Sequence, residues 1–163
     1  MLKSPRLIFK KIKEKNRPLY VAQVKIDNVM RYITGRGLSD EQANKRFDEA
    51  IALGKKHRDY GIFTIWLKNT EGGVYIGLAR LKLDEHDYVE IGYNLLEAHW
   101  GKGYGSEIGM TLMSFLKKHP EREDIYAIVE PENVGSVKIL EKLGLRRTNE
   151  MADATAVYYR VMK

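Results

Sequence analysis

Three consecutive segments in the middle of the chain alternate apolar and polar side chains, and this pattern constrains the fold more than any other feature. The first two, IFTIWLK (62–68) and VYIGLARLKL (74–83), flank the turn-forming residues NTEGG. The third, YVEIGYNL (88–95), follows after a short connection. Because segments with a two-residue period joined by short turns pair as neighbours, residues 62–95 predict three consecutive antiparallel strands.

The third of these segments separates two faces most cleanly. Its apolar face consists of every second residue: Val89, Ile91, Tyr93 and Leu95. The other face carries Glu90, Gly92 and Asn94. Since alternate side chains of a strand point to opposite sides of the sheet, the strand is expected to bury the first face and to keep polar chemistry on the second.

Helical periodicity brackets this block on both sides. The clearest helix start is Ser39, which forms a capping box with Gln42, and Gly54 is expected to end that helix. The other helices are predicted at 16–34 (one or two short ones), from the glycines near 103 to about 118, and at 133–143. The other strands are predicted at 5–10, 125–129, 145–150 and 155–162.

This order of elements predicts an α+β fold. Seven strands, most of them antiparallel, form one mixed sheet that helices flank on both faces. The chain has 163 residues, which is enough for one domain with a real core and too few for two. A single domain spanning 1–163 is therefore expected.

Composition excludes several classes of function. The chain has no cysteine, so disulfides, thiolate metal sites and a cysteine nucleophile are excluded, and no metal is implied. The formal net charge is +6, but 28 Lys and Arg are interspersed with 22 Asp and Glu, so no nucleic-acid partner is required. No apolar run approaches the roughly 18 residues of a membrane span, and the N-terminus is charged where a signal peptide is apolar. We expect a cytoplasmic protein.

The stretch HWGKGYGSEIG (99–109) places three glycines immediately before a predicted helix. A helix N-terminus leaves backbone N–H groups unpaired and carries partial positive charge, so it binds anions. Glycines there let the backbone approach an anion closely. The stretch predicts a diphosphate-bearing ligand, with a purely structural glycine loop as the alternative.

Three phosphate-binding motifs compete for this stretch. A P-loop needs Ser or Thr after its Lys, but Gly103 follows Lys102. The dinucleotide fingerprint needs G-x-G-x-x-G inside a βαβ unit, whereas this stretch reads G-x-G-x-G after an antiparallel strand. The glycine-rich loop that cradles the coenzyme A diphosphate remains.

A second motif distinguishes among these possibilities. EIGYNLLEAHWGKGYGSE (90–107) and VEPENVGSVKILEKLGL (129–145) together resemble the GNAT superfamily of acyl-CoA-dependent N-acetyltransferases. The family's loop pattern aligns with residues 100–105, where Trp100 replaces the commoner Gln or Arg. Its later signature matches Asn133, Ser136, Glu141, Lys142, Gly144 and Leu145. The variant looks like the ribosomal-protein N-terminal acetyltransferase branch, although residues 10–60 match only in pattern.

This resemblance implies how acetyl-CoA is held. The backbone of Tyr93, Asn94 and Leu95 would pair with the pantetheine arm where the fourth and fifth strands splay apart. The diphosphate would rest on the backbone of the six loop residues Gly101, Lys102, Gly103, Tyr104, Gly105 and Ser106. Asn133 would fix a further part of the cofactor, in addition to capping its helix. Packing is the favoured role for the side chains of Trp100 and Tyr104.

The chemistry implied is direct attack of a primary amine on a thioester, which needs a neutral amine and a proton for the departing sulfur. Many relatives place a Tyr seven residues after the Asn as the acid, but this chain has Leu140 there. Ser136 is the expected substitute. Glu90 is the expected base, with a solvated surface Glu as its alternative reading. Glu130, Glu150 and Tyr126 are weaker candidates for the base.

Without a compelling base, an amine of low pKa fits best. An α-amine has a pKa near 8, whereas a lysine amine near 10.4 needs about 3 kcal/mol more help at neutral pH. The expected acceptor is a protein or peptide N-terminus, bound by residues 20–60 and the last two strands. The alternatives are a small amine (polyamine, aminoglycoside or amino acid) and a non-catalytic acyl-CoA-binding module. The protein is expected to be a monomer or homodimer.

Overall fold

Seven strands form one sheet in the computed structural model, which describes residues 2–122, 124–148 and 156–161. The sheet order is β1-β2-β3-β4-β5-β7-β6. The strands are β1 (Leu7–Lys11), β2 (Gly61–Leu67), β3 (Val74–Leu83), β4 (Val89–Leu95), β5 (Asp124–Val129), β6 (Arg146–Thr148) and β7 (Ala156–Val161). Every pair is antiparallel except β4–β5. The predicted mixed sheet and the three-strand meander at its centre are confirmed.

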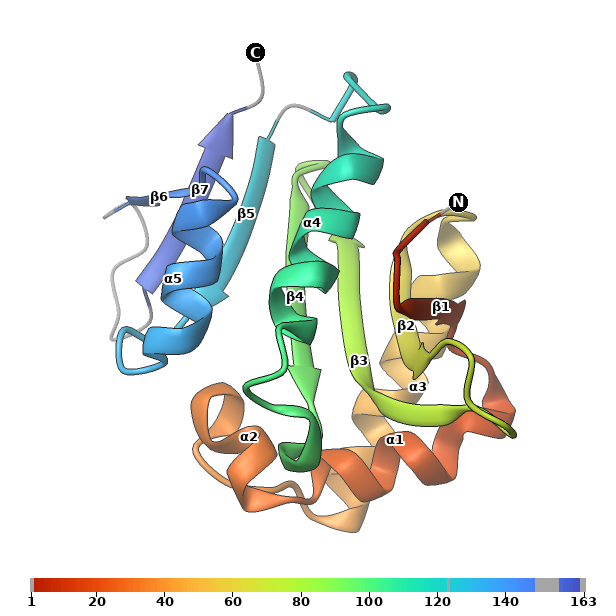
Figure 1. The fold of residues 1–163 in the computed structure, drawn as a ribbon. Coiled ribbons are helices and arrows are strands. Elements are labelled where there is room, and N and C mark those ends of the chain that lie inside the picture. Colours follow the sequence, from red (N-terminus) through yellow and green to blue (C-terminus); the bar gives the residue numbers. More distant parts are fainter. Residues whose placement is uncertain (1, 123, 149–155, 162–163) are drawn as a thin grey trace.

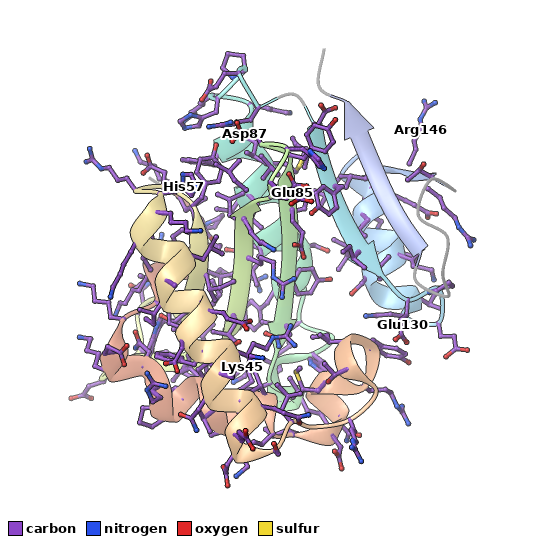
Figure 2. The ribbon with its side chains drawn as sticks, turned by 180° about the vertical axis from the view of Figure 1, so that it is seen from behind. Lys45, His57, Glu85, Asp87, Glu130 and Arg146 are labelled. Carbon is purple, nitrogen blue, oxygen red and sulfur yellow. The ribbon has the colours of Figure 1, made fainter. Side chains whose placement is uncertain are left out.

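Helices cover both faces of this sheet (Figure 1). They are α1 (Arg17–Val24), α2 (Asp27–Thr34), α3 (Asp40–Lys56), α4 (Tyr104–Leu116) and α5 (Val134–Lys142). Figure 1 shows α4 and α5 on the near face, and Figure 2, seen from behind, shows α3 running along the far face. In the part of the chain that the structure describes, no helix is long and apolar enough to cross a membrane.

Each face of the sheet has its own core. The α4 side buries the apolar face of β4 against Ile108, Leu112 and Leu116. The α1–α3 side buries Phe47, Met30 and their neighbours from the three helices. The apolar stripes predicted for these helices therefore face the sheet from opposite sides, so that the sheet separates the two cores.

The third helix is longer than predicted. The capping box of Ser39 and Gln42 is present, but α3 runs past Gly54 to Lys56. Gly54 lies close to the start of β2, since a Cβ added to Gly61 would lie 3.3 Å from Gly54 Cα, and a Cβ added to Gly54 would lie 3.3 Å from Lys11 Cε. The glycine permits this close packing at a cost of about 1 kcal/mol in helix propensity, and two lysines follow it in the last turn.

The parallel contact between β4 and β5 is very short. It joins Val89 to Ile125 and Glu90 to Tyr126 and extends no further, whereas β4 stays paired with β3 as far as Leu95. Within the described residues, the β5-facing edge of β4 beyond Glu90 has no strand partner. The sheet is therefore split at its centre, as the family resemblance predicts, and unpaired backbone groups of this kind need another partner.

Candidate functional site

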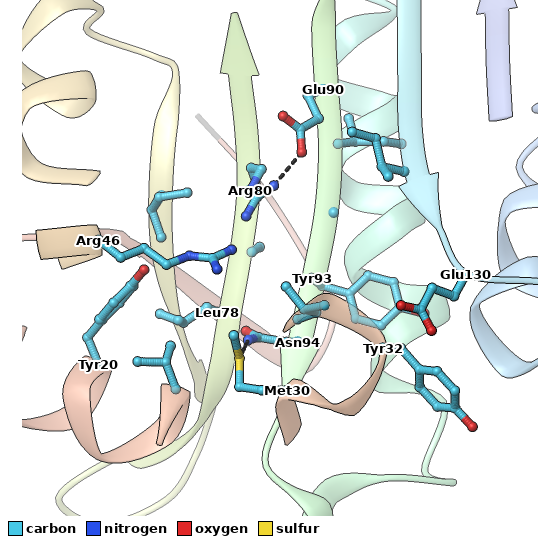
Figure 3. Close-up of a pocket in the computed structure, with 17 residues that line it drawn as sticks. Tyr20, Met30, Tyr32, Arg46, Leu78, Arg80, Glu90, Tyr93, Asn94 and Glu130 are labelled. Carbon is cyan, nitrogen blue, oxygen red and sulfur yellow. Dashed lines mark hydrogen bonds and ion pairs between the residues drawn. The ribbon is translucent and has the colours of Figure 1, made fainter. Parts of the chain in front are cut away.

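A cavity of about 310 Å³ lies on the α1–α3 side of the split, and we call it the large cavity (Figure 3). Its walls come from the first three helices and from β2–β5. Its charged side chains are Arg46, Arg80, Glu90 and Glu130. Gly92 lies between Glu90 and Asn94 on the same strand face, and its missing side chain leaves the floor open.

A second cavity of about 80 Å³, the small cavity, lies on the other side of the split beneath α4 and α5. Its lining includes Asn133, Ser136 and Leu140 from the second motif. Six residues line both cavities: Tyr32, Ile33, Ile91, Gly92, Tyr93 and Ile128. The two cavities therefore meet at the opening between β4 and β5, where a group bound from one side can reach a group bound from the other.

The phenol of Tyr93 lies at this junction. Its hydroxyl is 3.2 Å from Ser136 Oγ, and its ring lies so close to α4 that a Cβ on Gly105 would meet it at 2.9 Å. Burial raises the pKa of the Tyr93 hydroxyl, although the hydrogen bond with Ser136 works in the opposite direction. Tyr93 thus holds a firmly protonated hydroxyl at the meeting point of the cavities.

The second motif supplies the rest of the small cavity. Asn133 caps α5, accepting the Ser136 backbone N–H at 3.3 Å. Leu140, which stands where many relatives have Tyr, is buried and lines this cavity. Position 140 therefore contributes only apolar surface, and the residues with hydroxyls that line this cavity are Tyr32, Tyr93 and Ser136 among those described.

The glycine loop has the backbone geometry that an anion site needs. Gly101 and Gly103 have φ values of 70° and 78°, in the left-handed region that favours glycine. Gly103 is the N-cap of α4 and has no side chain to satisfy the first N–H groups of the helix. The loop residues line neither cavity, but Gly105 lies next to the junction, since a Cβ there would meet the Tyr93 ring.

The N-terminal segment anchors this loop. The buried carboxylate of Glu107 accepts the Arg6 backbone N–H at 2.7 Å and the Arg6 Nε at 2.6 Å, and also the Ser4 hydroxyl. Burial alone would raise the pKa of Glu107, but these hydrogen bonds hold it below its ordinary value. Arg6 also donates to the Lys102 carbonyl at 3.2 Å and lies over the Tyr104 ring. One arginine therefore fixes both ends of the loop.

The remaining side chains of the loop hold its shape. Lys102 Nζ donates to the Ala98 carbonyl at 2.8 Å, so its ammonium points back along the chain. Tyr104 packs against the core, as expected. Trp100 is 45% exposed, and its indole N–H donates to the Leu95 carbonyl at 2.8 Å. The side chain of Trp100 therefore forms a backbone hydrogen bond, and its expected packing role stays a prediction. Ser106 lies half-buried in the first turn of α4.

The backbone groups expected to meet the pantetheine arm differ in their availability. The Leu95 carbonyl is bound by Trp100, as described above. The Asn94 carbonyl accepts Gln23 Nε2 at 3.1 Å, and the same amide donates to Asn94 Oδ1 at 3.0 Å. Tyr93 precedes both, in the part of β4 that β5 leaves unpaired.

Glu90 is buried rather than solvated, with 6% of its surface exposed. Its carboxylate forms an ion pair with Arg80, and Lys82 Nζ lies 3.9 Å from its other oxygen. The polar face of β4 therefore faces the large cavity, because α1–α3 close over it. Glu90 and Ser136 line different cavities, and the structure does not bring them together.

The three weaker candidates for the base lie in different environments. Burial raises the pKa of Tyr126, and the Glu90 charge adds to the shift, so this phenol stays protonated. Glu130 lines the large cavity on the β5 side. Glu150 lies outside the described residues, as do the side chains of the final strand that was expected to help bind the acceptor.

The chain also matches a known protein family. The model of the acetyltransferase (GNAT) domain family matches residues 6–146. The chain belongs to the GNAT family. The match covers both motifs and the segment 10–60, where the sequence resembles the family only in pattern.

Relatives of this GNAT domain are found among bacterial proteins. An uncharacterized N-acetyltransferase of Bacillus licheniformis, p20, is 34% identical over 93 residues, which is 56% of this chain and 51% of p20, so the match spans about half of that relative. An acetyltransferase structure from Agrobacterium tumefaciens superposes with a TM-score of 0.84 at 21% identity, covering 99% of this chain and 94% of the other.

A third structure includes a ligand. RimL, a ribosomal L7/L12 alpha-N-protein acetyltransferase solved in complex with coenzyme A, superposes with a TM-score of 0.78 at 18% identity. The alignment covers 98% of this chain and 96% of that one. Identity at this level establishes the shared fold. Coenzyme A also fits the residues of this chain, which offer an unpaired strand edge, a narrow cavity beside that edge and a left-handed glycine loop at a helix start.

Proposed function

We propose that this acetyltransferase transfers an acetyl group from acetyl-CoA to the α-amine of a peptide or protein. The observation that carries the proposal is the meeting of two cavities at Tyr93. A narrow, uncharged cavity on the α4–α5 side suits an acyl-pantetheine arm, and a charged cavity on the α1–α3 side suits an amine. Direct transfer requires the two reactants to meet within van der Waals contact, and the split sheet provides that opening.

The chain's own residues divide the task of holding the donor. Gly101, Gly103 and the N–H groups of the α4 first turn would bind the diphosphate, with Arg6 fixing the loop. The free edge of β4 at Tyr93 would bind the pantetheine amides as a strand would. Asn133 and Ser136 line the α5 side of the small cavity. When bound, acetyl-CoA supplies the acetyl group as a thioester.

Two hydroxyls are placed to supply the proton that the departing sulfur needs. The family's usual Tyr is absent at position 140, but Tyr93 brings a phenol to the same cavity from β4. Its hydrogen bond with Ser136 orients the hydroxyl. We assign Tyr93 as the proton donor and Ser136 as the group that positions it, which extends the role expected for Ser136 alone.

The acceptor side lacks a strong base. Both lone-pair-bearing oxygens of Glu90 lie near cations, so this residue is better suited to shaping the cavity than to accepting a proton. Glu130 remains as a carboxylate that can attract an ammonium. A weak base is sufficient for an α-amine with a pKa near 8, but not for a lysine amine near 10.4.

Two matched peptides test this proposal. One has a free N-terminus and no lysine, and the other has a blocked N-terminus and one lysine. Release of free thiol from acetyl-CoA should be at least about tenfold faster with the first, given the 3 kcal/mol difference in deprotonation cost. Turnover of the lysine peptide alone would overturn the assignment of an α-amine.

A small amine is the second candidate acceptor. The large cavity, about 310 Å³, lies at the lower end of the range for small-molecule sites, which favours a compact acceptor or only the first residues of a chain. A non-catalytic acyl-CoA-binding module is less well supported, because Tyr93 supplies the hydroxyl that Leu140 lacks.

A further inference from the structure

We propose that Arg46 forms a carboxylate-binding subsite in the large cavity, so that the acceptor is an amine that also carries a carboxylate. This inference rests on the proposed function and adds the chemical class of the acceptor to it. Arg46 belongs to α3, in the part of the chain that shares only pattern with the family, and no motif pointed to it.

The environment of Arg46 differs from that of four arginines that form ion pairs. Arg6, Arg17, Arg80 and Arg122 each have a carboxylate within ion-pair distance. Arg46 is half-buried and lines the large cavity, yet no carboxylate lies within 4 Å of it among the residues described. A half-buried guanidinium without a counter-charge is costly unless a ligand supplies one.

The surroundings direct Arg46 into the cavity. Figure 3 shows its guanidinium reaching from α3 between Tyr20 and Arg80. Tyr20 forms a hydrogen bond with this guanidinium but does not neutralise its charge, because burial raises the pKa of the phenol and keeps it uncharged. The charge of Arg80 is already balanced by Glu90. The planar guanidinium of Arg46 has five N–H donors, so the donors that Tyr20 does not engage can bind a carboxylate.

The opposite side of the cavity carries the opposite charge. Glu130, at the end of β5, lies across the cavity from Arg46 in Figure 3. It has no cation within ion-pair distance in the part of the chain that the structure describes. An acceptor with an ammonium group near Glu130 and a carboxylate bound to Arg46 would pair with the charges on both sides of the large cavity. The amine would then lie on the β5 side, close to the opening at Gly92 and Tyr93.

The wall between these two charges is largely apolar, with Met30, Leu78 and Ile91 among its side chains. It suits a short hydrocarbon connection between amine and carboxylate. Two sources provide this chemistry: a free amino acid, through its α-carboxylate, or a peptide with an acidic side chain next to its N-terminal amine.

The test uses two matched pairs of acceptors with free amines. One pair is a peptide with Asp at its second position and the same peptide with Asn, and the other pair is a free amino acid and its amide. Each is assayed with the wild type, Arg46→Gln, Arg46→Lys and the control Lys45→Gln. Lys45 is exposed, adjacent on α3, and lines neither cavity (Figure 2), so its variant removes the same charge outside the site.

We expect wild type and Lys45→Gln to prefer the carboxylate member of one pair by about tenfold in kcat/KM, the range of one charge-assisted pair. Arg46→Gln should remove this preference by raising KM, with the neutral member unaffected, and Arg46→Lys should restore part of it. A preference in the peptide pair identifies an acidic peptide as the acceptor, and a preference in the other pair identifies a free amino acid. Equal use of both members by the wild type, or a preference that survives in Arg46→Gln, would overturn the subsite while leaving α-amine acetylation intact.

Binding separates this proposal from the function on which it rests. Calorimetry with the same pairs in the presence of coenzyme A measures the subsite even if no acceptor is acetylated. Tighter binding of the carboxylate members, lost in Arg46→Gln, would then support the subsite although the proposed transfer had failed. Equal or absent binding of both members of each pair would reject it. Unchanged melting temperatures of the variants show that they fold.

Discussion

The two sides of the split sheet differ in charge and in origin. The small cavity contains no charged side chain among the described residues that line it. Most of these residues belong to the two sequence motifs, 90–107 and 129–145. The large cavity contains four charged side chains and draws on three helices and four strands. This difference in charge supports the proposal that the small cavity takes the neutral pantetheine arm and the large cavity takes a charged acceptor.

The largest expected effect lies at the glycine loop, on the side of the small cavity. In Gly103→Val, a side chain enters a left-handed position at the start of α4, where backbone must approach the anion. We expect acetyl-CoA to bind more than about 100-fold more weakly, a loss of about 2.7 kcal/mol. Titration of the melting temperature with acetyl-CoA measures the change.

Gly72→Val is the matched control for this variant. Gly72 has a φ of 74° and open space around it in the hairpin turn before β3, so it carries similar backbone strain at a distance from the loop. Both variants should lose about 1–2 kcal/mol of stability. If both bind acetyl-CoA equally well, the glycine loop has only a structural role.

The next largest effect lies at the junction of the cavities. Tyr93→Phe removes one hydroxyl and keeps the ring against Gly105, so we expect kcat to fall about 30-fold or more, as for loss of a proton donor. The KM for acetyl-CoA should change less than about twofold, since the strand edge is intact. Steady-state kinetics measure both.

Ser136→Ala sharpens this prediction. It keeps the phenol and removes only the hydrogen bond that orients it, so its loss of kcat should be clearly smaller. A larger loss in Ser136→Ala than in Tyr93→Phe would exchange the roles that we assign to these two residues.

A smaller effect distinguishes the two carboxylates of the large cavity. Glu90→Gln leaves Arg80 and Lys82 without their counter-charge, and we expect the free energy of unfolding to fall by about 1–3 kcal/mol. Glu130→Gln should leave stability unchanged and lower kcat/KM about tenfold, through weaker attraction of the amine. Denaturant titration and kinetics on both variants separate the roles, and the reverse pattern would restore Glu90 as the base.

The smallest effect concerns the anchor of the glycine loop and depends on pH. Glu107 has a pKa below its ordinary value of 4.5 in the folded state, so its stabilisation is complete above about pH 4.5 and is lost as pH falls through the lower folded value. Glu107→Gln should therefore cost about 1 kcal/mol at neutral pH, and the difference from wild type should shrink below pH 4.5. A constant difference down to pH 3 would contradict this account.

Much of the small-cavity side could be predicted from the sequence. The strict alternation of 88–95, the glycines before a helix and Asn133 as a helix cap are local signals, and their physical causes act within a few residues. The same alternation even places Tyr93 on the face toward α4. A buried phenol needs a hydrogen-bond partner, and this signal was present in the sequence although only the backbone of Tyr93 was assigned a role.

The large cavity had no such signal. The sequence around Glu90 does not distinguish a solvated carboxylate from one buried against Arg80. Glu90 becomes part of a buried ion pair only because α1–α3 close over the sheet. Arg46 flanks the apolar stripe of α3, where a surface arginine is the ordinary expectation. Its position opposite Glu130 depends on segments more than eighty residues apart.

By itself the sequence determined the order of elements, the central antiparallel meander, the split beyond it through the family resemblance, and the glycine turn at the start of α4. These follow from periodicity and backbone conformation, which neighbouring residues set. Only the tertiary structure decided that Tyr93 meets Ser136, that Glu90 is paired, and that Arg46 and Glu130 lie across one cavity with no ion-pair partner among the described residues. Charges and hydroxyls acquire their roles from what surrounds them, and those surroundings form only when distant segments pack together.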